Sequence, residues 1–439
     1  MLYGAFFLPL KLNSIKKMLN IKLLRDQSAF VAERLLVKNF DASELIEKIL
    51  KLDTARRNTL TELEAGLSEQ NLNAKEIGRL MKEGRRAEAD EAKSRVAGLK
   101  ETSARLEKSL EGITSELNDL LVLLPNLPHS SVPSGKSAQD NILVREGGIT
   151  PQLMVNSPHW DLARKYDIID FDMGVKLTGA GFPVYKGKGA KLQRALISFF
   201  LDRNAEAGYT EVQPPVLVNE ASAYGTGQLP DKSDQMYYCQ LDNFYLIPTA
   251  EVPVTNIYRD VILQQDQLPV KMTAYTPCFR REAGSYGKDV RGLNRLHQFD
   301  KVEIVQICHP DTSYLALEDM VSHVENIVKS LELPYRIIRL CGGDMSFTSA
   351  LTYDFEVYSA AQQRWLEVSS VSNFESFQSN RLKLRYRDEE GKTQWAHTLN
   401  GSSLALPRIV AALLENNQDE KGISIPASLV QYTGFSYID

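Results

Sequence analysis

Hydrophobic positions in the first third of the chain repeat at the spacing of long helices. They form a heptad seam with one polar position, at Val96, Leu99, Ser103, Leu106, Leu110, Ile113, Leu117, Leu120 and Leu124. Residues 43–82 carry a looser apolar stripe, and Gly84 between the two halves is a residue type that commonly ends a helix. The pattern predicts an N-terminal antiparallel two-helix coiled-coil arm over about 43–124. Its two arms, 43–82 and 87–124, would each extend ~60 Å at ~1.5 Å per residue.

A different pattern follows this region. Residues 125–141 read PNLPHSSVPSGKSAQDN, whose prolines prevent a helix from continuing, and we expect a linker over 125–150. Over 151–439, short β-branched or apolar runs alternate with helical periodicity at 190–208 and 312–333. The runs read YTEVQPPVLV, NFYLIPTAE, KVEIVQIC, YRIIRL, TYDFEVYSA and RWLEVSSVSN. This mixture predicts an α+β domain built on a mainly antiparallel sheet with flanking helices.

Composition narrows the class of protein. A chain of 439 residues is long enough for two or three domains, and a net charge of −5 argues against a protein that binds nucleic acid with its whole surface. A local cationic cluster remains around the predicted helical turn, at Lys75, Arg79, Lys82, Arg85, Arg86, Lys93 and Arg95. Acidic residues are interspersed with it. Periodicity alone favours a dimerisation or spacer device, whereas cations at the tip of a long arm suit contact with a polyanion.

The four cysteines are far apart and form no CxxC pair, which indicates neither a disulfide framework nor a cysteine zinc site. A reducing, cytoplasmic location fits this usage. No apolar run approaches the ~20 residues that span a bilayer, so we expect no membrane segment. The first residues include the apolar stretch YGAFFLPL, but its charged flank follows it and no small-residue cleavage site is present. We interpret residues 1–17 as a disordered extension ahead of a working start at Met18.

Several chemistries lack their sequence signatures. No GxxxxGK[ST] loop, GxGxxG after a strand, HExxH or GxSxG is present, and the six histidines are scattered. What remains is chemistry that places charges around a phosphate and a small zwitterion. The segment 279–303, FRREAGSYGKDVRGLNRLHQFDKVE, concentrates such charges, although mixed charge with glycine is also typical of a solvated loop.

Within that segment, FRRE, a glycine-containing loop and RLHQFDKVE resemble motif 2 of the class II aminoacyl-tRNA synthetases. GYTEVQPPVLV at 208–218 resembles motif 1, and HTLNGSSLALPRIVAALLEN at 397–416 resembles motif 3. TAE at 249–251, LEVSSVSN at 366–373, the predicted arm and the proline-rich linker make the chain similar to the seryl-tRNA synthetases from Met18 onward. Five such segments in order make this resemblance specific.

The resemblance implies an N-terminal tRNA-binding domain over 18–124 and a class II catalytic domain over 151–439. It implies a homodimer formed through motif 1. The implied activity is ATP- and Mg²⁺-dependent conversion of L-serine to seryl-adenylate, followed by transfer of serine to tRNA(Ser), and to tRNA(Sec) where the organism has one. The cationic cluster at the arm's tip would then contact the tRNA.

The resemblance also implies site residues. Serine would be bound by Thr249, Ala250, Glu251, Arg280, Glu303, Asn400 and Ser402. ATP would be bound by Arg280, Arg281, Glu282, Leu296, Phe299, Glu367, Val368, Ser369, Ser370 and Arg408. Glu367 and Ser370 would hold Mg²⁺, and Arg280, Glu367 and Arg408 would be the catalytic residues.

Residue chemistry supports these roles independently. The planar guanidinium of Arg280 can bind two oxygens at once, and a pocket that hydrogen-bonds the serine hydroxyl can reject analogues that lack it. Taken singly, Glu251 and Glu303 are more often members of ion pairs and Phe299 a core residue, and Arg281 has the character of a solvent-facing neighbour. The joint pattern favours the functional interpretation.

Two alternatives and some departures remain. One alternative is a synthetase-like paralogue that adenylates a small amino acid and loads a carrier protein, although it would usually lack the arm. The other is a coiled-coil interaction protein with an inactive nucleotide site. Ser403 and Pro407 stand where many relatives have glycine, so the backbone approach near Arg408 is open to difference, and Arg281 replaces a small residue.

Overall fold

The computed structural model describes residues 21–283 and 291–439. The predicted extension 1–17, and Gly284 and Gly287 of the motif 2 loop, lie outside these ranges. The chain divides into two compact units, one within Leu19–Pro125 and one within Asn126–Asp439. We describe each unit by itself.

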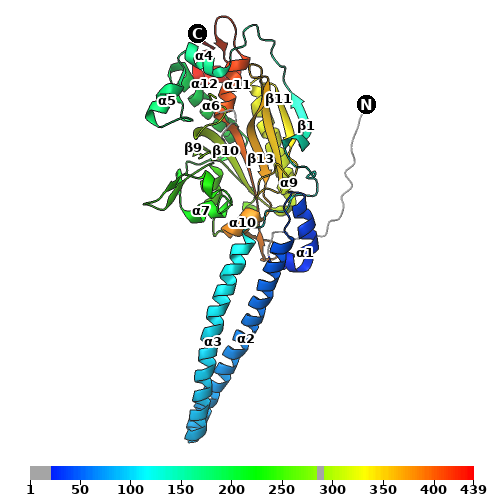
Figure 1. Cartoon of the computed structure of the whole chain (residues 1–439), viewed down its shortest axis with the longest axis vertical. Helices are drawn as coiled ribbons and strands as arrows, with labels where there is room; N and C mark the ends of the chain where they lie inside the picture. Colours follow the sequence, from blue (N-terminus) through cyan, green and yellow to red (C-terminus); the bar gives the residue numbers. More distant parts are fainter. Residues whose placement is uncertain (1–20, 284–290) are drawn as a thin grey trace, which may run out of the picture. The chain divides into compact units, whose positions relative to one another are not determined.

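The first unit consists of helices α1 (Ile21–Leu36), α2 (Ser43–Lys82) and α3 (Arg86–Leu121). Helices α2 and α3 pack side by side as a helical hairpin (Figure 1). Gly84 has φ +78° between them, a left-handed conformation that ends α2 without a side-chain penalty. The polar position of the seam is used across the pair, because Gln70 Nε2 donates to Ser103 Oγ at 2.6 Å and to the Leu99 carbonyl at 3.1 Å. The predicted pair of long N-terminal helices is confirmed.

The second unit is built on an eight-stranded sheet of order β1-β11-β12-β13-β16-β10-β9-β4. Its strands are β1 (Ile142–Gly147), β4 (Thr210–Glu211), β9 (Val270–Phe279), β10 (Gln298–Cys308), β11 (Tyr335–Arg339), β12 (Leu351–Ser359), β13 (Arg364–Asn373) and β16 (His397–Ala405). Neighbouring strands are antiparallel except for the short parallel pair of β4 and β9 (Figure 1). The prediction of a mainly antiparallel sheet is therefore confirmed.

Helices cover this sheet with apolar faces. The longer ones are α6 (Gly187–Glu206), α9 (Ser313–Ser330) and α11 (Leu406–Asn416), and each contacts several central strands. The two segments with helical periodicity became α6 and α9, as predicted. The shorter helices are α4 (His159–Lys165), α5 (Phe171–Leu177), α7 (Glu220–Gly225), α8 (Glu251–Asn256), α10 (Phe377–Leu382) and α12 (Ala427–Thr433).

Short strands form four further small sheets. They are β2 (Ile169–Asp170), β3 (Val184–Tyr185), β5 (Leu217–Val218), β6 (Tyr238–Cys239), β7 (Phe244–Leu246), β8 (Ile262–Gln264), β14 (Arg385–Arg387), β15 (Thr393–Trp395), β17 (Ile423–Ser424) and β18 (Tyr437–Ile438). The single-turn 3₁₀ helices are Ala138–Asp140, Ser233–Gln235, Gln265–Gln267 and Pro310–Thr312.

Two segments differ from the simplest interpretation of the sequence. The run at 209–218 is not one strand but β4 and β5, because Pro214 and Pro215 between them cannot donate main-chain hydrogen bonds. The segment 125–150 contains β1, which pairs with β11 at the edge of the large sheet. The end of that segment is therefore part of the sheet.

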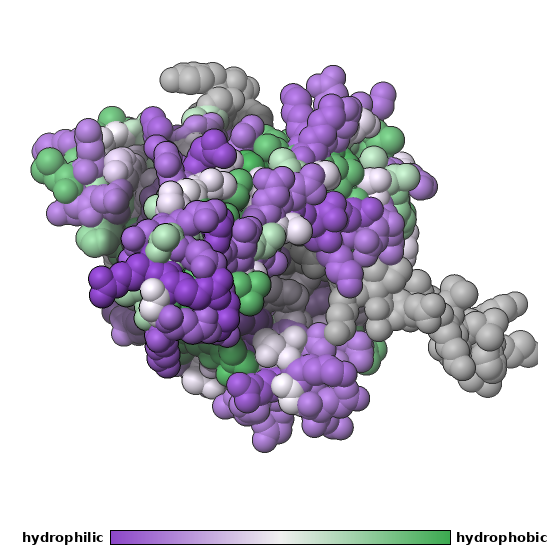
Figure 2. Space-filling view, turned by 90° about the horizontal axis from the view of Figure 1, so that it is seen from below, coloured by the Kyte–Doolittle hydropathy of each residue, from purple (hydrophilic) through white to green (hydrophobic). Residues whose placement is uncertain are grey.

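The surface is mixed in polarity. On the face drawn in Figure 2, hydrophilic side chains predominate and hydrophobic ones are scattered among them. None of the described helices is both long and apolar enough to cross a membrane. The four cysteines are free thiols.

Candidate active site

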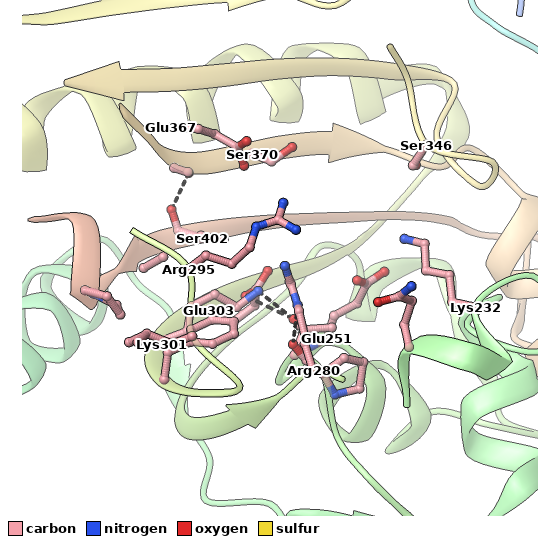
Figure 3. Close-up of a pocket in the computed structure, with 18 of the residues that line it drawn as sticks. Lys232, Glu251, Arg280, Arg295, Lys301, Glu303, Ser346, Glu367, Ser370 and Ser402 are labelled. Carbon is pink, nitrogen blue, oxygen red and sulfur yellow. Dashed lines mark hydrogen bonds and ion pairs between the residues drawn. The ribbon is translucent and has the colours of Figure 1, made fainter. Parts of the chain in front are cut away.

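A cavity of ≈ 520 Å³ opens in the second unit. The predicted site residues that line it are Thr249, Glu251, Arg280, Glu282, Leu296, Phe299, Glu303, Glu367, Val368, Ser369, Ser370, Asn400, Ser402 and Arg408. They come from the segment before α8 and its first residue, from the connection between β9 and β10, from β10, β13 and β16, and from the start of α11. In Figure 3, Glu367 and Ser370 lie on one side of the cavity and Glu251, Arg280 and Glu303 on the other. Ala250, which is fully buried, and Arg281, which is exposed, are not among the lining residues.

The deepest polar cluster of the cavity joins β10 to the segment before α8. Lys301 Nζ lies 2.5 Å from Glu303 Oε2 and donates to Thr249 Oγ1 at 2.7 Å. Thr249 Oγ1 in turn donates to Glu303 Oε2 at 3.3 Å. Glu303 is paired with Ser402 across the β10–β16 ladder, so the hydroxyl predicted to share its ligand comes from the facing strand. Burial raises the pKa of Glu303, and Lys301 opposes that shift.

A second buried carboxylate stands at the start of α8. Gln378 Nε2 donates to Glu251 Oε1 at 2.5 Å, and Gln378 Oε1 accepts from Thr398 Oγ1 at 2.7 Å, which fixes the orientation of the amide. Burial, reinforced by the nearby charge of Glu303, raises the pKa of Glu251 to about 7. Two carboxylates in one cavity, one of them with a pKa raised to about 7, suit a ligand that has a positively charged group.

The predicted motif 2 segment forms the antiparallel pair β9 and β10. The guanidinium of Arg280, next after β9, lies 5.1 Å from the centroid of the Phe299 ring, and its Nε donates to the Pro248 carbonyl at 3.4 Å. The Arg280 cation thus lies against the Phe299 ring, and Phe299 also lines the cavity. The carboxylate of Glu282 binds Arg295 at 2.7 Å. Glu282 has φ +51°, a left-handed conformation that is uncommon for a side chain of this type.

The opposite wall brings β13 and α11 together. Arg408 Nη1 donates to the Glu367 carbonyl at 2.8 Å, and Arg408 Nε donates to the Asn294 carbonyl at 3.1 Å. These bonds hold the guanidinium at the cavity while the Glu367 carboxylate stays 52% exposed. The Ser370 hydroxyl lines the same cavity. One exposed carboxylate and one hydroxyl are a donor set that fits Mg²⁺, which takes few protein oxygens when phosphate oxygens complete its shell.

A buried histidine supports the segment that follows the motif 2 loop. His159 Nδ1 donates to Glu415 Oε1 at 2.7 Å, and His159 Nε2 accepts from the main-chain N–H of Leu293 at 2.8 Å. Leu293 and Asn294 line the cavity. His159 had no role in the sequence interpretation, where it was one of several scattered histidines.

The departures in motif 3 have local partners. Ser403 Oγ donates to Asn204 Oδ1 at 2.8 Å, and Asn204 Oδ1 also accepts a hydrogen bond from His323 Nε2 at 2.8 Å. Asn204 Nδ2 donates to Thr273 Oγ1 at 2.9 Å, so the amide links α6, α9, β9 and β16. Pro407 lies in the first turn of α11, a position that needs no main-chain donor. Ser403 and Pro407 are both accommodated by this geometry.

The cations predicted to contact tRNA lie on α2 and α3 and in the turn between them. Several of them are paired within their own helix or turn. The pairs are Arg79 with Glu76 and Glu83, Arg85 with Glu83 and Glu88, Lys93 with Asp90, and Arg95 with Glu91. All of these side chains are solvent-exposed, so each pair contributes little to stability.

The cavity also contains residues that the sequence interpretation missed. Lys301, Arg295 and Lys232 line it alongside the predicted residues. Strand periodicity offered a signal for Lys301, since side chains two positions apart in a strand share a face and Glu303 was already predicted. Lys232 carried no comparable signal, because the loop before β6 brings it to the cavity only in three dimensions.

Comparisons with known proteins agree with this architecture. Residues 18–128 match the family model described as the seryl-tRNA synthetase N-terminal domain. Residues 237–417 match the tRNA synthetase class II core domain (G, H, P, S and T).

The relatives span nearly the whole chain. The chain is 51% identical to a serine–tRNA ligase of Salinibacter ruber over 96% of this chain and 99% of that protein. It is 47% identical to a serine–tRNA ligase of Methylacidiphilum infernorum over 96% and 100%. The crystal structure of seryl-tRNA synthetase from Pyrococcus horikoshii complexed with ATP is similar, with a TM-score of 0.86, 34% identity and coverage of 96% and 99%. The chain belongs to the seryl-tRNA synthetase family of class II aminoacyl-tRNA synthetases.

Proposed function

We propose that this protein activates L-serine with ATP to form seryl-adenylate and then transfers serine to tRNA(Ser). The observation that carries the proposal is that two parts of one cavity are lined by different kinds of side chain. Buried carboxylates with a lysine occupy one part, and an arginine–aromatic pair with a second arginine borders the other. A hydroxylated zwitterion and an anionic nucleotide are the substrates that suit those two parts.

Each charged group of serine would lie against a cavity residue of opposite charge. Glu251 would accept hydrogen bonds from the α-ammonium, Arg280 would bind the carboxylate, and Glu303 with Ser402 would take the side-chain hydroxyl. Asn400 completes the wall. The hydroxyl of Thr249 already accepts from Lys301 and from the Glu251 main-chain N–H at 3.3 Å and donates to Glu303. Thr249 would therefore act mainly by fixing the other polar groups, and Ala250 by packing beneath them.

ATP would occupy the arginine-bordered part. The adenine would lie between Phe299 and Arg408, with Leu296 beside it and the Val368–Ser369 main chain along one side. Glu282 would accept from the adenine amino group after exchanging its bond with Arg295, and Arg281 would remain at the solvent-facing edge. The solved relative from Pyrococcus horikoshii is complexed with ATP, which supports ATP as the nucleotide of this chain.

The first chemical step needs little proton transfer from the protein. The serine carboxylate is ionised at neutral pH and attacks the α-phosphorus, so pyrophosphate leaves and a mixed anhydride forms. Arg280 would bind the α-phosphate oxygens as negative charge builds up on them, and Arg408 would bind the terminal phosphate. Glu367 and Ser370 would hold Mg²⁺, which neutralises phosphate charge when it is bound. Most of the acceleration would come from positioning and electrostatics.

The second step requires the tRNA. The helical hairpin would contact the tRNA through phosphates, using Lys75, Arg79, Lys82, Arg85, Arg86, Lys93 and Arg95. We propose that the active form is a cytoplasmic homodimer joined through motif 1, and that tRNA(Sec) is a further substrate where it exists. Gln228, Lys232, Ser346 and Thr348 line a further part of the cavity, and we propose that this part receives the terminal nucleotide of the tRNA.

Pyrophosphate exchange with a panel of amino acids tests this function. We expect exchange with serine at a rate at least ~10²-fold above that with alanine, because a hydroxyl-binding pocket rejects analogues that leave its groups unpaired. A variant that lacks residues 43–124 should keep exchange and lose transfer to tRNA. Exchange without any transfer by the full chain would instead favour a paralogue that loads a carrier protein, and absence of exchange with every amino acid would overturn the proposal.

A further inference from the structure

The Lys301–Glu303 ion pair is buried, and it uses only one of the two carboxylate oxygens of Glu303. Lys301 is 6% exposed and Glu303 is 1% exposed, and both line the cavity. Within the described part of the chain, the hydrogen bonds of the Glu303 carboxylate all end on Oε2. Oε1 carries none of them. The carboxylate is therefore anchored by one oxygen and offers the other to a ligand.

Donor directions in this cluster are fixed. The Lys301 ammonium is a donor only, so Thr249 Oγ1 accepts a hydrogen bond from it. The Thr249 hydroxyl therefore donates its own proton to Glu303. Both groups that reach Glu303 Oε2 are therefore donors, and both favour the ionised carboxylate over the protonated one. Without Lys301, burial and the neighbouring Glu251 charge would oppose ionisation of Glu303, and Arg280 would be the cation that still favours it.

We propose that Lys301 is the residue that makes the serine pocket selective, because it holds Glu303 as an anion with Oε1 directed to the substrate hydroxyl. Lys301 is a positioning residue, since it acts through Glu303 and not on the reacting atoms. This inference rests on the proposed function. It assigns the discrimination between serine and alanine to a pair of residues two positions apart on β10.

The physical reason is the cost of an unsatisfied charge. When serine binds, its hydroxyl satisfies Glu303 Oε1; when alanine binds, a methyl group faces the same oxygen. An ionised buried carboxylate loses more by this than a neutral carboxyl group does, so the charge that Lys301 maintains enlarges the penalty for alanine. Replacing the lysine should weaken serine binding and, in proportion, reduce the rejection of alanine.

The test is pyrophosphate exchange by the full chain with serine and with alanine at saturating ATP. Lys301→Met keeps the length of the side chain and removes its charge. We expect kcat/KM for serine to fall about 10- to 100-fold, the magnitude of one charged hydrogen bond, mainly through KM. The KM for ATP should not change, and the ratio of serine to alanine activity should shrink. Lys301→Arg, which retains the charge, should keep most of the discrimination.

Lys188 provides a matched control. It forms an ion pair with Asp439 in the same unit, yet it does not line the cavity. Lys188→Met should leave the serine-to-alanine ratio unchanged. Equal loss of serine and alanine activity in Lys301→Met would overturn the proposal, because it would indicate a purely structural role.

A second comparison covers the case in which Lys301→Met does not fold. Glu303→Gln alone and the double variant Lys301→Met/Glu303→Gln should have the same serine-to-alanine ratio within about twofold, because Lys301 acts through the Glu303 charge. A further large loss of discrimination in the double variant would show that Lys301 acts by another route. Absence of serine exchange in the unmodified protein would refute the proposed function and not this inference alone.

Discussion

The main-chain N–H of Leu293 donates to His159 Nε2 at 2.8 Å, while His159 Nδ1 binds Glu415. This pairing fixes the imidazole in the tautomer that carries its proton on Nδ1. The carbonyl of the next residue, Asn294, accepts a hydrogen bond from Arg408 Nε. A histidine outside all three motifs thus fixes the main-chain segment to which the Arg408 guanidinium is hydrogen-bonded.

Gly292 makes this support testable. It has φ +58°, and a Cβ added there would lie 2.1 Å from His159 Nε2. We expect Gly292→Ala to reduce serine-dependent exchange at least ~10-fold, since small displacements near a reacting centre are costly. The control is Gly391→Ala, because Gly391 has φ +76° with nothing within 4 Å of the added carbon and shares only the backbone strain. Similar activity in the two variants would mean that contact with His159 is unimportant.

Adjacent arginines allow a sharp comparison at the position proposed to bind the α-phosphate. Arg280 lies over Phe299 and lines the cavity, whereas Arg281 is exposed and is not among the lining residues. We expect Arg280→Lys to lower kcat/KM for exchange ~10²-fold or more, because lysine cannot bind two oxygens in one plane. Arg281→Lys should change it less than about threefold. Steady-state exchange with serine and ATP varied separately distinguishes these results.

Glu251 predicts a pH dependence. Its pKa is raised to about 7 by burial, so at pH 6 it is largely protonated in the free protein and cannot oppose the α-ammonium of serine. We therefore expect kcat/KM for serine to rise between pH 6 and pH 8, and Glu251→Gln to lower activity and to flatten this rise.

The same shift affects stability. The folded protein holds a proton on Glu251 that the unfolded chain releases above its ordinary carboxyl pKa of 4.5, so this group destabilises the fold as pH rises from about 4.5 to 7. Thermal unfolding of the protein and of Glu251→Gln across this range measures the contribution. A profile that is equally steep in the variant would assign the titration to another group.

The hairpin cations differ in their existing partners. Arg95 is paired with Glu91, whereas Lys82 and Arg86 flank the turn near its tip. We expect the charge reversal Lys82→Glu/Arg86→Glu to raise the KM for tRNA several-fold and to leave exchange unchanged, with a weaker salt dependence of tRNA binding. Arg95→Gln serves as the paired comparison and should have a smaller effect. Loss of exchange activity in the charge-reversal variant would contradict this division of roles.

Much of the architecture could be predicted because it follows from local periodicity. The seam from Val96 to Leu124 specified a long helix, and Gly84 marked its turn. The strand that carries Glu303 was expected from the apolar and β-branched run KVEIVQIC, whereas the strand that carries Ser402 was expected from the resemblance to motif 3. The exceptions were the paired prolines Pro214 and Pro215, which split one expected strand into two.

The site was predicted in outline but not in its supporting contacts. Resemblance named Glu251 and Arg408, whereas the supports that hold them depend on contacts between distant segments. Gln378 reaches Glu251 from α10, and His159 reaches Leu293 from α4. No periodicity links these residues, so their roles appear only when the chain is folded.

The bond between Gln70 and Ser103 has a consequence for how the hairpin works. Sliding α2 along α3 by one turn would move the Gln70 amide away from Ser103, the one polar position of the seam, and place it beside the apolar side chain of Leu99 or Leu106, so the bond to the Ser103 hydroxyl would be lost. The two helices therefore have a single favourable alignment. A pair of helices that cannot slide past each other keeps a constant length from base to turn, and that length would fix how far from the base the proposed contact with tRNA lies.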